Sequence, residues 1–201
     1  IGSQNLRPYY SFDYNGIHFI SVPQLLDTIL VNQETINWLK HDLAINKNKT
    51  TLIMSHNSIK DTTYDNNENG YRTVINSHQV LNVINKHNNV IAWLHGHNHL
   101  YEIVRKDQRL YVSNGRIGGF NPPEAWGPYG HGHLGGIYFA VSKNSLVIKS
   151  YSATKKDFLS NLGFPNLSDQ LNVQTTFNPD AQMNYYFGHG KLTNNVKHEM
   201  T

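Results

Sequence analysis

The chain has 201 residues, of which 38% are hydrophobic and 15% are charged, which indicates one packed domain and excludes a disordered chain. It contains no cysteine, which excludes disulfides, thiolate zinc sites and cysteine nucleophiles. The 17 basic and 14 acidic residues are scattered, so nucleic-acid binding is not indicated, and no apolar run has the length of a membrane span.

The first elements are a predicted β-hairpin and a predicted helix. Residues 9–14 and 17–22 are rich in β-forming side chains and flank Asn15-Gly16, a pair that tolerates the positive φ angles of a type I′ turn. After Asn32, apolar residues recur with helical spacing. This pattern predicts an amphipathic helix that ends near Asn46.

A strand–helix–strand unit follows. Residues 51–55 and 90–94 are apolar without alternation, as expected of strands that are covered on both faces. Between them, a helix is predicted from residue 76 or 77 to residue 87, with its apolar positions on one stripe. This order of elements predicts a right-handed crossover and therefore a parallel sheet.

The remaining sequence predicts hairpins, a long loop and an irregular end. The two hairpins pair residues 100–104 with 110–113 and residues 136–141 with 146–151. Residues 114–135 are rich in glycine and proline and are expected to form a surface loop. Periodicity fades after residue 154, so residues 155–201 are expected to be an irregular C-terminal extension.

Three histidines lie within five residues at the end of the second buried strand: His95, His97 and His99. Neutral imidazole is the commonest metal ligand, and so dense a cluster is hard to explain by packing. His56 ends the other buried strand, and adjacent parallel strands would bring its imidazole to the same edge as His97. The alternative for His56 is a capped loop residue.

The Gly-His-x-His pattern occurs a second time, at His131 and His133, inside the long loop. Because histidine is frequent in this chain, a chance match is expected, and the loop context favours solvated side chains. The copy at His97 instead follows a buried strand, at the edge where open α/β sheets place their sites. Only that copy is therefore predicted to bind metal.

Two motifs at strand ends carry a family resemblance. Ser55-His56-Asn57 follows one buried strand, and Gly96-His97-Asn98-His99 follows the next about 40 residues later. Together with the preceding helix and hairpin, this arrangement resembles the C-terminal half of calcineurin-like metallophosphoesterases over roughly residues 9–151. The resemblance implies an α/β fold, a mixed two-sheet β-sandwich flanked by helices, with residues 1–154 as the C-terminal portion of that domain.

The resemblance implies metal-dependent hydrolysis of phosphate esters, either monoesters or diesters, by a metal-bound hydroxide. Two divalent or trivalent ions (Mn, Fe or Zn) would align the reaction. Carried over by position, His56 and His97 would bind one ion and His99 the other. His95 could orient a ligand from outside the metal shell, with a packed strand-end histidine as the alternative. Arg116 could clamp a phosphate, with a solvated loop arginine as the alternative.

The family also carries Asp-x-His, Gly-Asp and Gly-Asn-His motifs upstream of the part seen here, and none of these occurs in the 201 residues. The bridging aspartate and the general acid are therefore expected in a missing N-terminal half, whose removal the non-methionine start favours. The chain alone is expected to be inactive. The alternative is a non-catalytic binding or interaction domain that keeps the fold without the full metal site. The substrate, the metal, the oligomeric state and the cellular location stay open.

Overall fold

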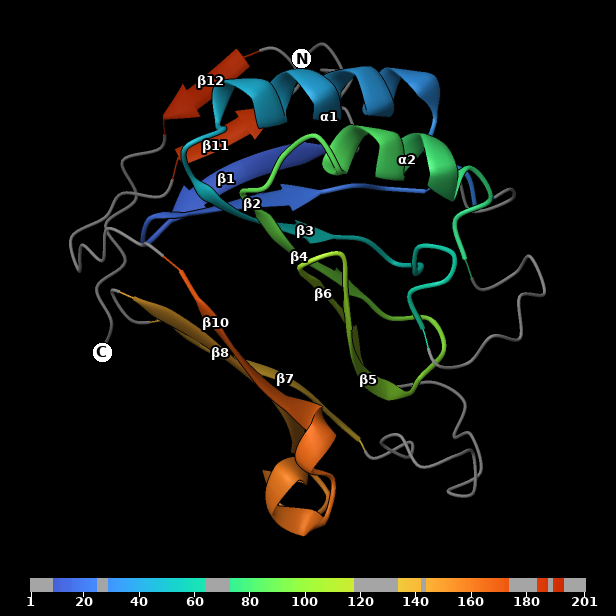
Figure 1. The fold of residues 1–201 in the computed structure, drawn as a ribbon, viewed down its shortest axis with the longest axis vertical. Helices are drawn as coiled ribbons and strands as arrows, with labels where there is room; N and C mark the ends of the chain where they lie inside the picture. Colours follow the sequence, from blue (N-terminus) through green and yellow to red (C-terminus); the bar gives the residue numbers. More distant parts are fainter. Residues whose placement is uncertain are drawn as a thin grey trace, which may run out of the picture.

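The computed structural model describes residues 9–24, 29–63, 73–117, 134–141, 144–173, 184–187 and 190–193. Within these ranges the chain forms two sheets and two α-helices in three layers (Figure 1). Helices α1 (Gln33–Ile45) and α2 (Ser77–Ile84) cover one face of the larger sheet, and the smaller sheet covers the other. The predicted α/β architecture, a mixed two-sheet sandwich flanked by helices, is confirmed.

The larger sheet mixes parallel and antiparallel pairs. In the described residues its strand order is β12 (Gly190–Thr193), β11 (Asn184–Phe187), β1 (Tyr10–Tyr14), β2 (Ile17–Ser21), β3 (Thr50–Met54), β4 (Val90–His95), β6 (Arg109–Asn114) and β5 (Tyr101–Lys106). Strands β2, β3, β4 and β6 run parallel to one another. The crossover through α2 that connects β3 and β4 is the one that the sequence predicts, and α1 connects the parallel strands β2 and β3 in the same way.

The smaller sheet is antiparallel. Its strands, in spatial order, are β10 (Ser168–Asn172), β8 (Ser145–Ser152) and β7 (Gly135–Val141), and the short β9 (Asp157–Phe158) also pairs with β8. The predicted hairpin of residues 136–141 with 146–151 corresponds to β7 and β8.

The local signals for the first hairpin and the first helix are confirmed. Asn15 and Gly16 have φ angles of 49° and 76°, the left-handed backbone that a type I′ turn requires. The side chain of Asn32 accepts a hydrogen bond from the backbone N–H of Thr35 at 2.7 Å, which caps α1. The helix ends where expected, with Asn46 as its C-cap.

Helix α2 is shorter than predicted, because it ends at Ile84 rather than at residue 87. The backbone N–H groups of Lys86 and His87 donate to carbonyls only three residues back, those of Val83 and Ile84. The chain therefore tightens into a final turn before β4, which is how many helices satisfy their last carbonyl groups.

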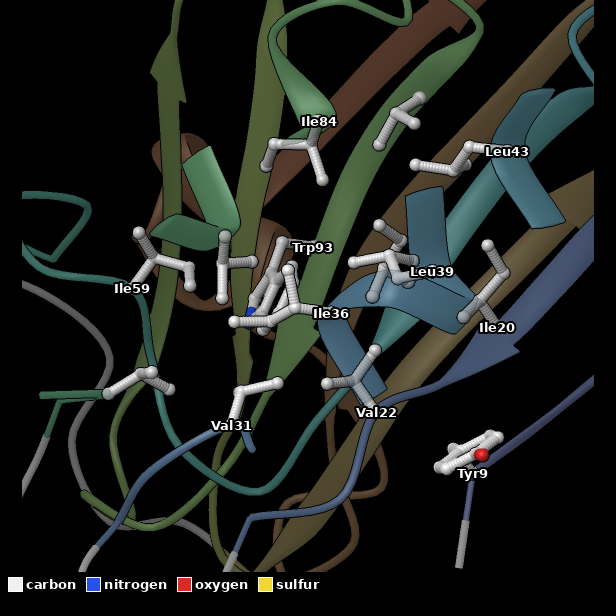
Figure 2. Close-up of a cluster of buried hydrophobic side chains, with 14 of the residues drawn as sticks. Tyr9, Ile20, Val22, Val31, Ile36, Leu39, Leu43, Ile59, Ile84 and Trp93 are labelled. Carbon is white, nitrogen blue, oxygen red and sulfur yellow. The ribbon is translucent and has the colours of Figure 1, made fainter. Parts of the chain in front are cut away.

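Each face of the larger sheet packs against its own hydrophobic core. On the helix face, Trp93 of β4 is fully buried among side chains that include Ile36 and Ile84 of the two helices (Figure 2). On the other face, the neighbouring Ala92 packs in the core between the sheets, with Ile148 of β8. Strand β4 is therefore covered on both faces, as its unbroken apolar sequence predicts.

The chain after residue 154 differs from the predicted irregular extension. Strand β10 pairs with β8, and β11 pairs with β1. Two 3₁₀ helices, η1 (Leu159–Leu162) and η2 (Pro165–Leu167), bury Leu159 and Leu167 against Tyr101 of β5. Only Leu171 of β10 is buried, so the sequence of this strand lacks the alternation of apolar and polar residues that predicts a strand. The predicted domain boundary at residue 154 stays a prediction.

The predicted long loop is only partly described. Residues 118–133, which include His131 and His133, lie outside the described residues. Before and after them, Arg116 and Leu134 form an isolated parallel bridge. No helix within the described ranges is long and apolar enough to cross a membrane.

Candidate metal site

His56 and His97 are brought together by the parallel pairing of β3 and β4. Met54 pairs with Leu94 at the carboxyl ends of the two strands. Beyond this pair, the backbone N–H of Ser55 donates to Leu94 O at 2.9 Å, and that of Gly96 donates to His56 O at 3.0 Å. These two hydrogen bonds extend the pairing past the strand ends and hold both histidines at one edge of the sheet.

The two imidazole rings are in direct contact. His56 Nε2 lies 3.1 Å from His97 Nδ1, and the ring centroids are 5.0 Å apart with planes at 80°. His56 is exposed and His97 is half-buried, so the pair is open to solvent. His56 and His97 therefore lie together at the sheet edge that the sequence predicts for them.

The backbone of the Gly-His-x-His loop turns at the histidines rather than at the glycine. His97 and His99 have φ angles of 72° and 58°, whereas Gly96 does not have a positive φ. Gly96 instead allows a close approach, because a Cβ there would lie 3.2 Å from Asn114 Oδ1, a tight contact.

The distance within the pair fits a shared metal ion. With Zn–N bonds of about 2.0–2.1 Å and tetrahedral angles, two ligating nitrogens lie about 3.3 Å apart. The observed 3.1 Å is close to that value, and it also suits one N–H···N hydrogen bond between neutral rings. The donor set is two imidazoles, which suits transition metals.

His99 does not complete a three-histidine site with this pair. Within the described residues, no three His, Cys, Asp or Glu side chains form a group that could hold a metal ion. His99 is half-buried in the same loop, and its assignment to a second ion stays a prediction.

His95 lies beneath the loop, with 3% of its surface exposed. Its Nδ1 donates to Gly96 O at 3.3 Å, and its Nε2 has no hydrogen-bond partner among the described residues. Burial, with smaller effects from the nearby His56 and His97, lowers the pKa of His95 to about 4. The ring is therefore neutral at pH 7, and its role in orienting a ligand stays a prediction.

Arg116 lies near Tyr101. Its carbonyl accepts a hydrogen bond from the backbone N–H of Gly135 at 3.0 Å. Burial raises the pKa of Tyr101 to about 12, against a smaller opposing effect from the charge of Arg116. The predicted phosphate clamp stays a prediction.

A cleft of about 660 Å³ opens beside the histidine pair. It is lined by residues at the carboxyl ends of β2 and β3, by Tyr10 of β1 and by Ile29, together with His56 and His97. The side chain of Gln24 crosses one wall, where it donates to Ser55 Oγ and accepts from the backbone N–H of Asn57. The sequence does not single out Gln24 or Ile29, because neither stands in a motif.

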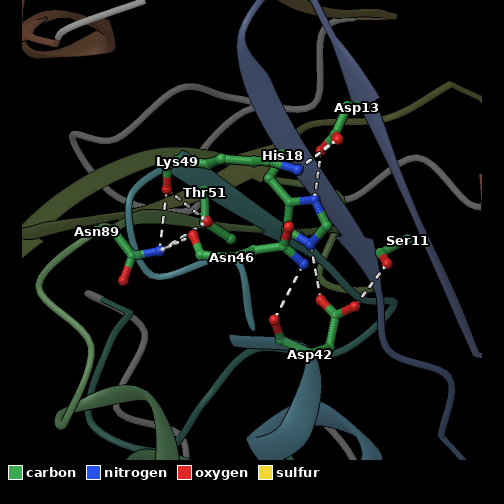
Figure 3. Close-up of polar contacts among 8 residues, drawn as sticks. All are labelled: Ser11, Asp13, His18, Asp42, Asn46, Lys49, Thr51 and Asn89. Carbon is green, nitrogen blue, oxygen red and sulfur yellow. Dashed lines mark hydrogen bonds and ion pairs between the residues drawn. The ribbon is translucent and has the colours of Figure 1, made fainter. Parts of the chain in front are cut away.

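A second polar cluster lies near the amino ends of β2 and β3. Figure 3 shows the His18 ring between two carboxylates: Nδ1 lies 2.6 Å from Asp13 Oδ1, and Nε2 lies 2.7 Å from Asp42 Oδ2. Lys49 Nζ donates to Asp13 at 2.6 Å, and Ser11 donates to Asp42 at 2.9 Å. His18 is fully buried, so its ring is not accessible to a substrate, and the cluster joins helix α1 to the sheet.

Comparisons with known proteins support the fold. No family model and no curated protein matches the chain. Among solved structures, GAP50, described as the anchor in the inner membrane complex of Plasmodium, aligns with a TM-score of 0.59 and 14% identity over 85% of this chain. PhoD aligns with a TM-score of 0.52 and 12% identity over 99% of it. A dimetal phosphatase from Danio rerio aligns with a TM-score of 0.48 and 15% identity over 72% of it.

The chain spans 56% of GAP50, 46% of PhoD and 38% of the dimetal phosphatase. At such low identity, the likeness concerns the backbone rather than particular side chains. It agrees with the layers, the parallel strands and the two sheets described above. The chain has a metallophosphoesterase-like fold.

Proposed function

We propose that His56 and His97 hold one metal ion of a site that hydrolyses phosphate esters. The proposal is carried by one observation: the 3.1 Å between His56 Nε2 and His97 Nδ1 at the carboxyl edge of two parallel strands. Ligand sites of open α/β sheets lie at this edge. The metallophosphoesterase-like fold supports a phosphate ester as the substrate.

The chemistry of such a site follows from its ligands. A divalent ion there would polarise a phosphoryl oxygen and lower the pKa of a water molecule. Manganese, iron and zinc all accept imidazole ligands, so the ion is not specified. The chain's own part is to hold the two rings in one geometry, through the backbone hydrogen bonds of Ser55 and Gly96.

His99 is assigned to a second ion, and the remaining ligands and the general acid are assigned to polypeptide outside these 201 residues. The chain alone therefore turns over little phosphate ester, even with added manganese. Efficient turnover of an activated monoester or diester by the chain alone would contradict this division of the ligands.

The test is a calorimetric titration of the metal-free chain with Zn²⁺. One ion per chain is expected, with binding weakened at least about tenfold in His56→Ala and in His97→Ala, because each loses one of the two protein ligands. His78→Ala is the matched control, since His78 is exposed on α2. Unchanged binding in both site variants would refute the assignment.

The other function that the sequence leaves open is a non-catalytic binding or interaction domain with the same fold. The same titration separates the two hypotheses. A chain that takes up no Zn²⁺, with His56 and His97 joined only by a hydrogen bond, would favour the binding domain.

A further inference from the structure

The cleft beside the histidine pair has an uncharged lining. Among the lining residues that the structure describes there is no Asp, Glu, Lys or Arg. Polyanionic ligands such as diphosphates and nucleic-acid backbones are recognised by Lys and Arg side chains, and the described part of the lining contains neither. The two imidazoles are therefore the part of the described lining suited to a phosphate group or its metal ion.

The remaining wall is largely apolar. Four partly exposed side chains line it: Tyr10, Pro23, Ile29 and Met54. On the polar side, Gln24 is engaged by Ser55 and by the backbone of Asn57. Small-molecule sites have volumes of about 300–1,000 Å³ with mostly apolar walls and a few polar groups, and this cleft fits that description.

Ile29 is held in an unfavourable backbone conformation on this wall. Its φ angle is 49°, in the left-handed region that a β-branched residue rarely adopts. The backbone N–H of Ile75 donates to Ile29 O at 3.1 Å and helps to hold the residue in place. Strain of this kind is concentrated at functional sites, and here it presents an apolar side chain to the cleft.

We infer that the cleft binds the apolar part of the substrate, so that the ester carries an aromatic or similarly apolar alcohol group. This inference rests on the proposed function, because the phosphate end is placed at His56 and His97. The apolar group lies against Tyr10, Ile29 and Met54. Esters with polar or polyanionic alcohol groups gain nothing from these walls.

The test compares two monophosphates of equal charge on the Zn²⁺-loaded chain: fluorescent 1-naphthyl phosphate and glycerol phosphate. We expect 1-naphthyl phosphate to bind at least about tenfold more tightly, because its rings bury apolar surface that glycerol lacks. Ile29→Asn should remove most of this preference, since asparagine tolerates the left-handed backbone but puts an amide on the wall. Zn²⁺ binding should be unchanged in this variant.

The matched control is Ile45→Asn, at the far end of α1, where the side chain is 61% exposed. It should keep the full preference for 1-naphthyl phosphate. Equal binding of the two phosphates by a chain that binds Zn²⁺ would overturn this inference and leave the proposed function intact. Equal loss of preference in the two Ile→Asn variants would also overturn it. Failure to bind Zn²⁺ would overturn the proposed function and this inference with it.

Discussion

His18 of β2 and Asp42 of α1 are joined by a hydrogen bond of 2.7 Å between Nε2 and Oδ2, and both side chains are almost completely buried. With Asp13 on its other nitrogen, the imidazole donates from both positions and carries a positive charge. A buried charge of this kind is stable only while its partners are present. The pair therefore ties the helix layer to the sheet.

Replacing Asp42 by asparagine should lower the free energy of unfolding by about 3 kcal/mol, because the buried imidazolium loses one of its carboxylates. The measurement is urea denaturation. Asp169→Asn is the control: its carboxylate accepts from Arg105 Nη2 at 2.8 Å at the surface, and its loss should cost less than about 1 kcal/mol. Equal costs for the two variants would contradict the role given to His18.

The same cluster predicts a loss of stability at alkaline pH. Burial alone would lower the pKa of His18, but the hydrogen bonds that its ring donates to Asp13 and Asp42 outweigh this effect and raise the pKa above its usual 6.5. A raised pKa contributes stability that is complete below pH 6.5 and is lost as the pH rises through the folded-state pKa. Urea denaturation at pH 6.5, 8 and 9 should show this decline, and Asp42→Asn should reduce it. If Asp42→Asn loses as much stability as the parent chain between pH 6.5 and 9, the loss comes from groups other than His18.

Because of His95, the stability of the metal-free chain should change in the opposite direction at acidic pH and rise with pH. Its pKa is lowered to about 4, mainly by burial, so the unfolded chain binds a proton there that the folded chain does not. Stability should therefore fall as the pH drops from 6.5 towards 4, by about 3 kcal/mol from this residue. His95→Leu should flatten the acid limb between pH 6.5 and 4.5. An unaltered acid limb in that variant would rule out His95 as its source.

The sequence predicts the fold and the histidine edge well, but not how the edge is shaped. Unbroken apolar runs mark β3 and β4, and parallel pairing then brings His56 and His97 to one place. The cleft could not be predicted, because Tyr10, Ile29 and Met54 stand in no motif and meet only when the sheet forms. Strand β10 was missed for a related reason, since it is held by pairing with β8 and buries only Leu171.

Two glycines should respond very differently to alanine. A Cβ at Gly115 would lie 2.3 Å from the Tyr101 ring, and its φ of 71° disfavours any other residue. Gly115→Ala should therefore destabilise the chain by about 3 kcal/mol or more. Gly136 has open space around its Cβ position and no positive φ, so Gly136→Ala should change stability by less than about 0.5 kcal/mol. Thermal unfolding of both variants measures the difference, and similar melting temperatures would contradict the packing at Tyr101.

Ile29→Asn should stabilise the chain while it weakens ligand binding. The left-handed backbone at φ 49° costs isoleucine about 1 kcal/mol or more, and asparagine avoids most of that cost. Because Ile29 is only partly buried, little apolar burial is lost in exchange. Urea denaturation should thus show a gain of about 1 kcal/mol in the variant, with Ile45→Asn showing none. If isoleucine is kept at this position because binding needs its side chain, its cost in stability is expected. A lower stability of Ile29→Asn would show instead that Ile29 contributes to packing.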